Sequence, residues 1–468
     1  MDLYQLNTLD IIKLLKTKEI SPLDCLSSLQ KRISNVNKIV NALVTLCFER
    51  AELNAKKIME RDIKDRGMLQ GLPVPIKDLT DVSGVRCTSG SPIYKDRIAE
   101  NSDILVKNIE SKGGIIYAMT NTPEFGAGAN TFNEVFGYTL NPWDITKSAA
   151  GSSGGAAVAL STGMAWVAHG SDMGGSLRNP ASFCSVVGMR PSPGRVASTP
   201  SGILDGTLGV NGPMARNVLD LAFFLDAMSG ENYRDPVSQI KPDESYLSYA
   251  KLNNKPKKIA ISKDLGLPPV DPEIQNVVLD VGKTLEKHGL IVEEAHPDLK
   301  EAPVTSKILR SLAFYVNLKS QYKNNKNLLK PEIIWNIEEG MKLSMEEISY
   351  AQNQRVNIFN RMQSFFEEYD LLICPATIVN PFPVKERYVK ECNGVEFSNY
   401  VEWLNIVSAI TLTSSPAISL PAGFSKEKLP IGVQLISKCK DEANLLSYAR
   451  FIEQCLNIDN PIPIDPIN

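Results

Sequence analysis

Two short loops rich in glycine and serine contain the residues best suited to chemistry. They are AGSSGGA (150–156) and SDMGGSLR (171–178). The first leads into a small apolar helix (156–160), and the second follows an apolar run (164–168). Tight glycine turns can align several backbone N–H groups, as an oxyanion hole requires or as a phosphate cradle does. The P-loop spelling G-x-x-x-x-G-K-[ST] and a complete G-x-G-x-x-G are both missing, so the loops favour an oxyanion hole with a serine nucleophile.

A serine hydroxyl needs a base to become a nucleophile. The chain has three histidines and no H-E-x-x-H, H-x-E or G-x-S-x-G motif, which disfavours a zinc hydrolase and an α/β-hydrolase elbow. One histidine would suffice for a Ser-His-Asp site, so that alternative stays open. A lysine kept neutral by burial is the other choice. Lys77 fits, because it ends the apolar segment 72–76, which should run inward. Taken alone, these residues also have structural interpretations, since such lysines are usually exposed and such serines usually form turns or caps.

The elements around these loops alternate between helix and strand. A helix is predicted over 104–112, ended by two glycines, and a strand over 115–119. Further strands are expected at 259–261, 290–292, 371–375 and 432–436, and further helices at 274–285 and 442–455. Residues 1–60 and 300–365 have helical patterns, and 233–258 has the character of a connection. This alternation predicts α/β layering.

Composition and charge bound the class of protein. Of 468 residues, 43% are hydrophobic and 22% charged, enough for a large core. The net charge of −3 gives no reason to expect nucleic acid as a partner. There is no secretory signal pattern and no run of eighteen apolar residues. The eight cysteines are scattered without a C-x-x-C pair, which favours reduced thiols over a zinc site. We therefore expect a cytoplasmic protein without a metal and without membrane contact.

Several motifs resemble the signature of the amidase-signature family. They are GSSGG (151–155), DMGGSLR (172–178) and PASFCSVVGMRP (180–191), with GLPVPIKD (71–78) matching the family's upstream lysine block. The intervals of 75 positions from Lys77 to Ser152 and 24 from Ser152 to Ser176 also match. The resemblance runs from about residue 5 to 455 and is weakest over 235–370. Departures are Ala149-Ala150 in place of Pro-Gly, Met173 in place of threonine and Ala156 in place of serine.

The resemblance implies a role for each matching residue. Ser176 is the nucleophile that forms the acyl-ester, Ser152 in a cis peptide relays the proton, and neutral Lys77 is the base. The backbone N–H groups that resemble the oxyanion hole are those of Met173, Gly174, Gly175 and Ser176. Gly126 aligns with a position whose backbone contacts substrate. Three further residues are expected to hold the loops in place: Ser153, Asp172 and Arg178.

The fold implied is a single large α/β/α domain with a mixed central sheet flanked by helices. An N-terminal helical segment (1–60) would pack on a catalytic domain (61–468) with a variable region at about 235–370. In that region Phe314, Tyr315 and Trp335 are candidates for the pocket wall. The implied reaction is hydrolysis of a carboxamide, a non-peptide or small amide, to an acid and ammonia or an amine, without metal or organic cofactor. The expected partner is the amide substrate, with neither nucleic acid nor membrane, and a homodimer is one option for the oligomeric state.

Two alternatives are weighed against this interpretation. The A subunit of the glutamine-dependent aminoacyl-tRNA amidotransferase belongs to the same family, but its members usually carry Asp-Glu-Phe where this chain has Pro123-Glu124-Phe125. A non-catalytic binding protein on the same fold would be favoured by loss of Lys77, Ser152 or Ser176, and all three are present. The identity of the amide and of the leaving group stays open.

Overall fold

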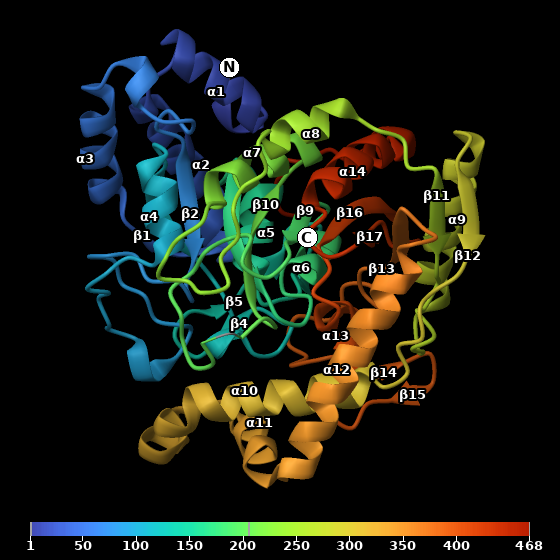
Figure 1. The fold of residues 1–468 in the computed structure, drawn as a ribbon. Helices are drawn as coiled ribbons and strands as arrows, with labels where there is room; N and C mark the ends of the chain where they lie inside the picture. Colours follow the sequence, from blue (N-terminus) through green and yellow to red (C-terminus); the bar gives the residue numbers. More distant parts are fainter. Residues whose placement is uncertain (1, 205, 468) are drawn as a thin grey trace.

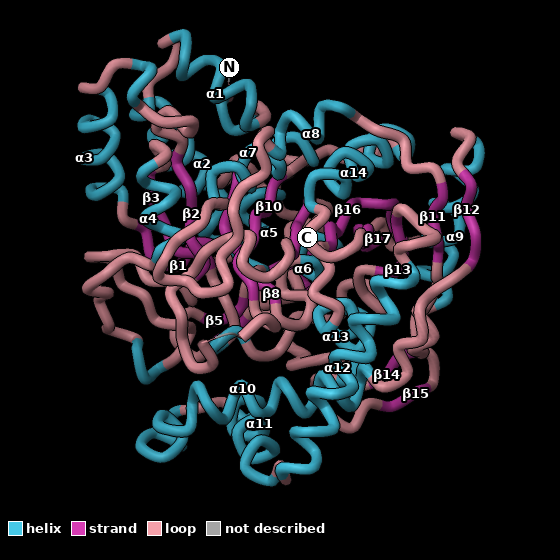
Figure 2. Tube along the Cα trace, viewed as in Figure 1, coloured by secondary structure: helices cyan, strands magenta, loops and turns pink. Residues whose placement is uncertain are grey.

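The computed structural model describes residues 2–204 and 206–467, and its centre is a mixed sheet (Figures 1 and 2). Within those residues the sheet has eight strands. In spatial order they are β12 (Ile291–Glu294), β11 (Lys258–Ile261), β13 (Leu371–Pro375), β17 (Pro430–Ile436), β16 (Ala417–Phe424), β9 (Val187–Arg190), β10 (Val210–Ala215) and β8 (Val167–Asp172). β11 runs parallel to both its neighbours, and the remaining pairs are antiparallel. The predicted mixed α/β sheet is confirmed.

Helices cover both faces of this sheet. On one face lie α7 (Val218–Met228), α9 (Pro272–Lys287) and α14 (Glu442–Leu456), with α8 (Tyr246–Leu252) packed on α7 and α14. On the other lie α5 (Gly154–Ser161) and α6 (Arg178–Phe183). Strands covered on both faces are apolar throughout. Every residue of β13 and β17 is accordingly buried, whereas the edge strand β12 carries exposed glutamates.

A smaller sheet lies beside the first, and it corrects one expectation. It consists of β1 (Leu43–Leu46), β3 (Ile115–Thr120) and β2 (Pro73–Lys77). The helices α2 (Pro22–Val40), α3 (Phe48–Met59) and α4 (Ile104–Ser111) pack against it, whereas α1 (Thr8–Thr17) contacts α7. Residues 1–60 were expected to be helical, yet β1 pairs antiparallel with β3. A four-residue strand is too short to show a period of its own, so its pairing partner decides its conformation. The predicted cap of α2 is confirmed, since Ser21 forms a capping box ahead of Pro22.

The end of β2 reaches the edge strand of the large sheet. The backbone N–H of Lys77 donates to His169 Nδ1 on β8 at 3.2 Å. α5 contacts strands of both sheets, namely β2, β3, β8 and β10. All its residues are buried, as expected of a short helix that is apolar on every side. Gly155 allows this packing, because a Cβ there would lie 2.4 Å from Asn121 N.

The earlier part of the variable region contributes β11, α9 and β12 to the large sheet and its cover. The later part, residues 302–365, forms a helical layer at one end of the sheet, seen at the bottom of Figure 1. Its helices are α10 (Ala302–Asn325), α11 (Pro331–Lys342) and α12 (Met345–Phe365), and α10 also packs on α13 (Asn405–Leu412). The predicted connection 233–258 contains one unpredicted helix, α8. Two-stranded ribbons complete the fold: β4 (Phe132–Asn133) with β5 (Gly137–Tyr138), β6 (Leu140–Asn141) with β7 (Asp144–Ser148), and β14 (Glu391–Cys392) with β15 (Val395–Glu396). In the part of the chain described, no helix is long and apolar enough to cross a bilayer.

Candidate active site

The amine of Lys77 lies in a buried cluster of serine hydroxyls at the end of β2. Its Nζ is 2.7 Å from Ser152 Oγ, 2.8 Å from Ser153 Oγ and 3.0 Å from Ser171 Oγ. The side chain is 0% exposed. Burial lowers the pKa of Lys77 from its ordinary 10.5 to about 7, while the nearby charge of Asp172 acts in the opposite direction. A large fraction of this amine is therefore neutral at neutral pH and able to accept a proton.

The two loops singled out in the sequence lie against each other around this amine. The first begins α5, and the Gly151–Ser152 peptide is cis, as predicted. The second links β8 to α6. Ser153 N–H donates to the carbonyl of Ser176 at 3.1 Å, so the loops are joined directly. Ser176 is half-buried, and no hydrogen bond among the described residues connects its Oγ to Ser152.

Asp172 organises the second loop through a buried ion pair. Its carboxylate accepts from Arg178 Nε at 3.1 Å and Nη2 at 2.9 Å, and from the N–H groups of Gly175 and Leu177 at 3.0 Å each. Arg190 is a second cation, at 3.5 Å. Burial alone would raise the pKa of Asp172, but the charges and hydrogen bonds of Arg178 hold it well below its usual range. The carboxylate therefore stays ionised and fixes the turn that precedes Ser176.

The four backbone N–H groups expected to form the oxyanion hole differ in their hydrogen bonding. That of Gly175 donates to Asp172. Those of Met173, Gly174 and Ser176 have no acceptor among the described residues. The turn requires glycine, because Gly175 has a φ of +88° and a Cβ there would lie 2.5 Å from Asn179 Oδ1. Three N–H groups are thus left for a ligand oxygen.

Both loops contribute to the wall of a cavity of about 480 Å³, the second through Ser171, Asp172 and Met173. Ser152, Ser176 and Gly126 are at its wall, and a Cβ on Gly126 would lie 3.5 Å from Ser152 Oγ. Phe314, one of the three aromatic candidates for the wall, lines it. Tyr315 and Trp335 are not among the residues that line it. Tyr315 packs against the apolar cluster to which Phe314 also belongs, and Trp335 makes an edge-to-face contact with Tyr400.

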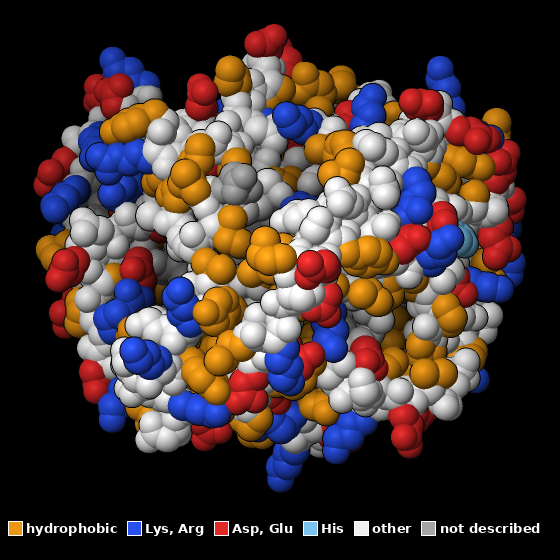
Figure 3. All heavy atoms as spheres, turned by 60° about the horizontal axis from the view of Figure 1, so that its bottom comes forward, with side chains coloured by type: hydrophobic (Ala, Val, Ile, Leu, Met, Phe, Trp, Pro, Cys, Tyr) orange, Lys and Arg blue, Asp and Glu red, His pale blue; other side chains and the backbone are white. Residues whose placement is uncertain are grey.

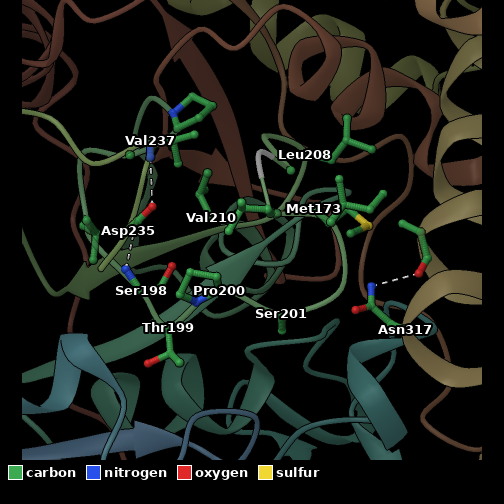
Figure 4. Close-up of a pocket in the computed structure, with 18 residues that line it drawn as sticks. Met173, Ser198, Thr199, Pro200, Ser201, Leu208, Val210, Asp235, Val237 and Asn317 are labelled. Carbon is green, nitrogen blue, oxygen red and sulfur yellow. Dashed lines mark hydrogen bonds between the residues drawn. The ribbon is translucent and has the colours of Figure 1, made fainter. Parts of the chain in front are cut away.

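A smaller cavity of about 200 Å³ adjoins the first and is drawn in Figure 4. Its lining shares Met173, Val210 and Asn317 with the larger cavity. In Figure 4 the Met173 sulfur and the Asn317 amide lie on the same side of this space, with Ser198 and Thr199 across from them. Together the two cavities give the site room for more than the reacting group.

His169 and Ser171 were not identified in the sequence as neighbours of Lys77. They lie two positions apart on β8, so their side chains project from one face of the strand. His169 Nδ1 accepts from the backbone of Lys77, which leaves Nε2 protonated and donating to Asn211 Oδ1 at 3.0 Å. Burial lowers the pKa of His169 to about 4. Both ring nitrogens are occupied, so this histidine supports the fold around Lys77 and does not contact either loop serine.

Residues 2–204 and 206–467 hold no group of three or more histidine, cysteine, aspartate or glutamate side chains placed to share an ion. All eight cysteines are free thiols, and most are buried. Basic and acidic side chains are interspersed on the molecular face drawn in Figure 3.

Three comparisons with known proteins, by family model, by sequence and by structure, all indicate the same family. The sequence model of the family described as Amidase matches residues 24–446. An acylamidase of Rhodococcus erythropolis is 30% identical over 97% of this chain and 96% of its own. The A subunit of a glutamyl-tRNA(Gln) amidotransferase from Alkaliphilus metalliredigens is 31% identical over 99% of both chains. The crystal structure of a bacterial aryl acylamidase of the amidase-signature family superposes with a TM-score of 0.89 at 26% identity, covering 96% of each chain.

Proposed function

The chain belongs to the amidase-signature family, and on that premise we propose that it hydrolyses a small carboxamide through an acyl-enzyme on Ser176. An amide-hydrolysing enzyme is what the family and the matching acylamidases support. The observation that carries the finer proposal is the buried Lys77 amine, which lies 2.7 Å from the Oγ of Ser152, a residue that lines the same cavity as Ser176. The products are a carboxylic acid and ammonia or an amine.

Acylation transfers one proton through two hydroxyls. Ser176 Oγ attacks the amide carbonyl carbon and passes its proton to Ser152 Oγ, while the Ser152 proton moves to neutral Lys77 Nζ. Collapse of the tetrahedral intermediate breaks the C–N bond, and the proton returns along the same route to the leaving nitrogen. Water then attacks the Ser176 ester by the same relay and releases the acid. The relay requires a hydrogen bond between Ser176 and Ser152 to form when substrate binds, as catalytic hydrogen bonds often do.

Backbone N–H groups supply the stabilisation of the intermediate. Those of Met173, Gly174 and Ser176 have no other acceptor among the described residues and would donate to the carbonyl oxygen as it becomes negative. Asp172 and Arg178 hold this turn and are not in contact with the relay serine. Gly126 leaves space beside Ser152, so its backbone can approach the substrate.

A second candidate function is the A subunit of an aminoacyl-tRNA amidotransferase. Curated relatives of that name reach 31% identity over 99% of this chain. The solved A subunit from Thermotoga maritima shares the fold of this chain, with a TM-score of 0.72 at 24% identity. Against this candidate, Pro123 stands where the family's A subunits usually carry aspartate. The next residue, Glu124, is buried and accepts hydrogen bonds from Ser91 Oγ and from the N–H of Lys330.

Ammonia release separates the two functions. We expect the purified chain to hydrolyse members of a panel of primary aliphatic and aromatic amides on its own, with Ser176→Ala inactive as the matched control. Glutamine, tested with and without a tRNA-binding partner protein, is the second arm. Inactivity on the panel together with glutaminase activity only in the presence of the partner would replace the first proposal with the second.

A further inference from the structure

Arg310 brings a positive charge to the wall of the active-site cavity. It lies on α10, in the variable region, and lines the same cavity as Ser152 and Ser176. Its Nη1 is 3.9 Å from Met173 Sδ, and a Cβ on Gly174 would lie 3.8 Å from that nitrogen. The guanidinium therefore faces the loop whose N–H groups are unpaired.

No carboxylate among residues 2–204 and 206–467 lies within 4.0 Å of this guanidinium. Its partners are neutral: Nη2 donates to Tyr400 Oη at 2.9 Å, and the buried Nε has no hydrogen-bond partner. Several other buried or half-buried arginines have counter-ions, as in the pairs Arg178–Asp172, Arg195–Glu442 and Arg387–Glu332. Buried Arg66 and Arg216 have none within the described residues, but backbone carbonyl oxygens accept their hydrogen bonds. A charge facing a cavity without a counter-ion is costly unless a ligand supplies the negative charge.

The surroundings hold the guanidinium in place. Its carbon lies 4.7 Å from the centre of the Phe314 ring and 5.5 Å from that of Tyr400. Tyr400 is itself fixed by a hydrogen bond from Asn336 Nδ2 and by an edge-on contact with Trp335. Aromatic neighbours stabilise the cation without neutralising it and exclude water from one side. The guanidinium is therefore preorganised for a ligand in the cavity.

We propose that Arg310 binds an anionic group of the substrate, so that the preferred substrates are amides that also carry a carboxylate. A planar guanidinium donates to a carboxylate in a charge-assisted and often bidentate manner, which gives both orientation and selectivity. Nη1 is the donor that faces the catalytic loop, so the carboxylate would lie a few atoms from the amide. This inference rests on the proposed amidase function and deepens it by naming the substrate class.

The test compares charged and neutral amides of matched shape. Malonamate, succinamate and glutaramate are assayed beside their uncharged methyl esters, with ammonia release as the readout. We expect the best charged amide to exceed its ester in kcat/KM by at least roughly tenfold. Arg310→Gln should lower kcat/KM for the best charged amide roughly 10- to 100-fold, because the charge-assisted contact is lost. It should change kcat/KM for the neutral ester little. Arg310→Lys should keep part of the preference, since it keeps the charge and loses the planar fork.

A matched control and a binding measurement complete the design. Arg355 on α12 also has neutral partners, including Thr207 Oγ1 at 2.6 Å, but it does not line this cavity, so Arg355→Gln should keep the preference. The neutral ester's rate reports whether Arg310→Gln is folded. If no amide is turned over, the proposed function fails, and calorimetry of succinamate with Ser176→Ala, with and without Arg310→Gln, still decides the role of Arg310. Equal treatment of charged and neutral amides by the native chain, or a preference that survives Arg310→Gln, would overturn the inference.

Discussion

Lys77 Nζ and Ser152 Oγ lie 2.7 Å apart although 75 positions separate them in the sequence. β2 brings the lysine to this point from the small sheet, and the turn before α5 brings the serine. The hydroxyls of Ser153 and Ser171 occupy other positions around the same amine. The buried lysine therefore has only neutral hydrogen-bond partners, which favours the neutral amine that can act as a base.

A buried lysine with a lowered pKa has a measurable effect on stability. The pKa is about 7 in the folded state and 10.5 ordinarily, so the unfolded chain binds more protons between these values. The free energy of unfolding should rise with pH across that window. Burial of the Lys77 amine lowers the free energy of unfolding by on the order of 5 kcal/mol below pH 7, and this loss vanishes above pH 10.5.

Lys77→Met isolates this contribution. We expect the variant to gain about 1–3 kcal/mol at pH 6.5, because the burial cost disappears while the serine hydroxyls lose a partner. The difference from the native chain should shrink as pH rises toward 10. Urea unfolding at several pH values measures it, and a difference that stays constant with pH would show that Lys77 titrates normally.

The buried pair of Asp172 and Arg178 should be essential for stability. Arg178→Met leaves part of the carboxylate unpaired in a fully buried environment, so we expect a loss of about 3–5 kcal/mol in the free energy of unfolding. Lys283→Ala is the control, because Lys283 and Asp280 form a pair whose side chains are both 68% exposed. That change should stay within about 0.5 kcal/mol. Equal losses in the two variants would contradict the structural role of Asp172.

His169 should be dispensable for the chemistry. Its ring nitrogens are taken by the Lys77 backbone and Asn211, and no loop serine is among its partners. His169→Asn keeps an acceptor for the Lys77 N–H, so we expect activity to stay within roughly tenfold of the native value. The measurement is kcat/KM on whichever amide is turned over best. A loss above a thousandfold, the size expected for a general base, would revive a Ser-His-Asp mechanism.

The sequence motifs predicted the loops and the approximate place of the lysine, because glycine turns and a short apolar strand have local signals. Ser171 and His169 could not be placed in the same way. Strand alternation puts them on one face of β8, but only the packing of β2 against β8, from different sheets, turns that face toward Lys77. Arg310 gave no signal, since its position beside Tyr400 depends on a contact between α10 and a turn 90 positions further along the chain.

The same distinction holds for the fold. Long helices such as α9 were predicted, because Ile274, Val278 and Leu285 recur at helical spacing. β1 was missed, since four residues carry no reliable period and pairing with β3 decides their conformation. The hydrogen bond from the Gly175 N–H to Asp172 likewise depends on the conformation of the closed turn. Residue types alone do not determine that conformation.

The most direct test of the central claim needs no knowledge of the substrate. A fluorophosphonate probe reacts with an activated serine, and peptide mass spectrometry locates the labelled residue. The mechanism predicts labelling at Ser176, at a rate that rises with pH through about 7, where Lys77 loses its proton. Lys77→Ala should slow labelling roughly 10²- to 10⁴-fold, and Lys77→Arg should not restore it, because arginine stays protonated. Labelling of Ser152 with Ser176 untouched, or an unchanged rate in Lys77→Ala, would contradict the account.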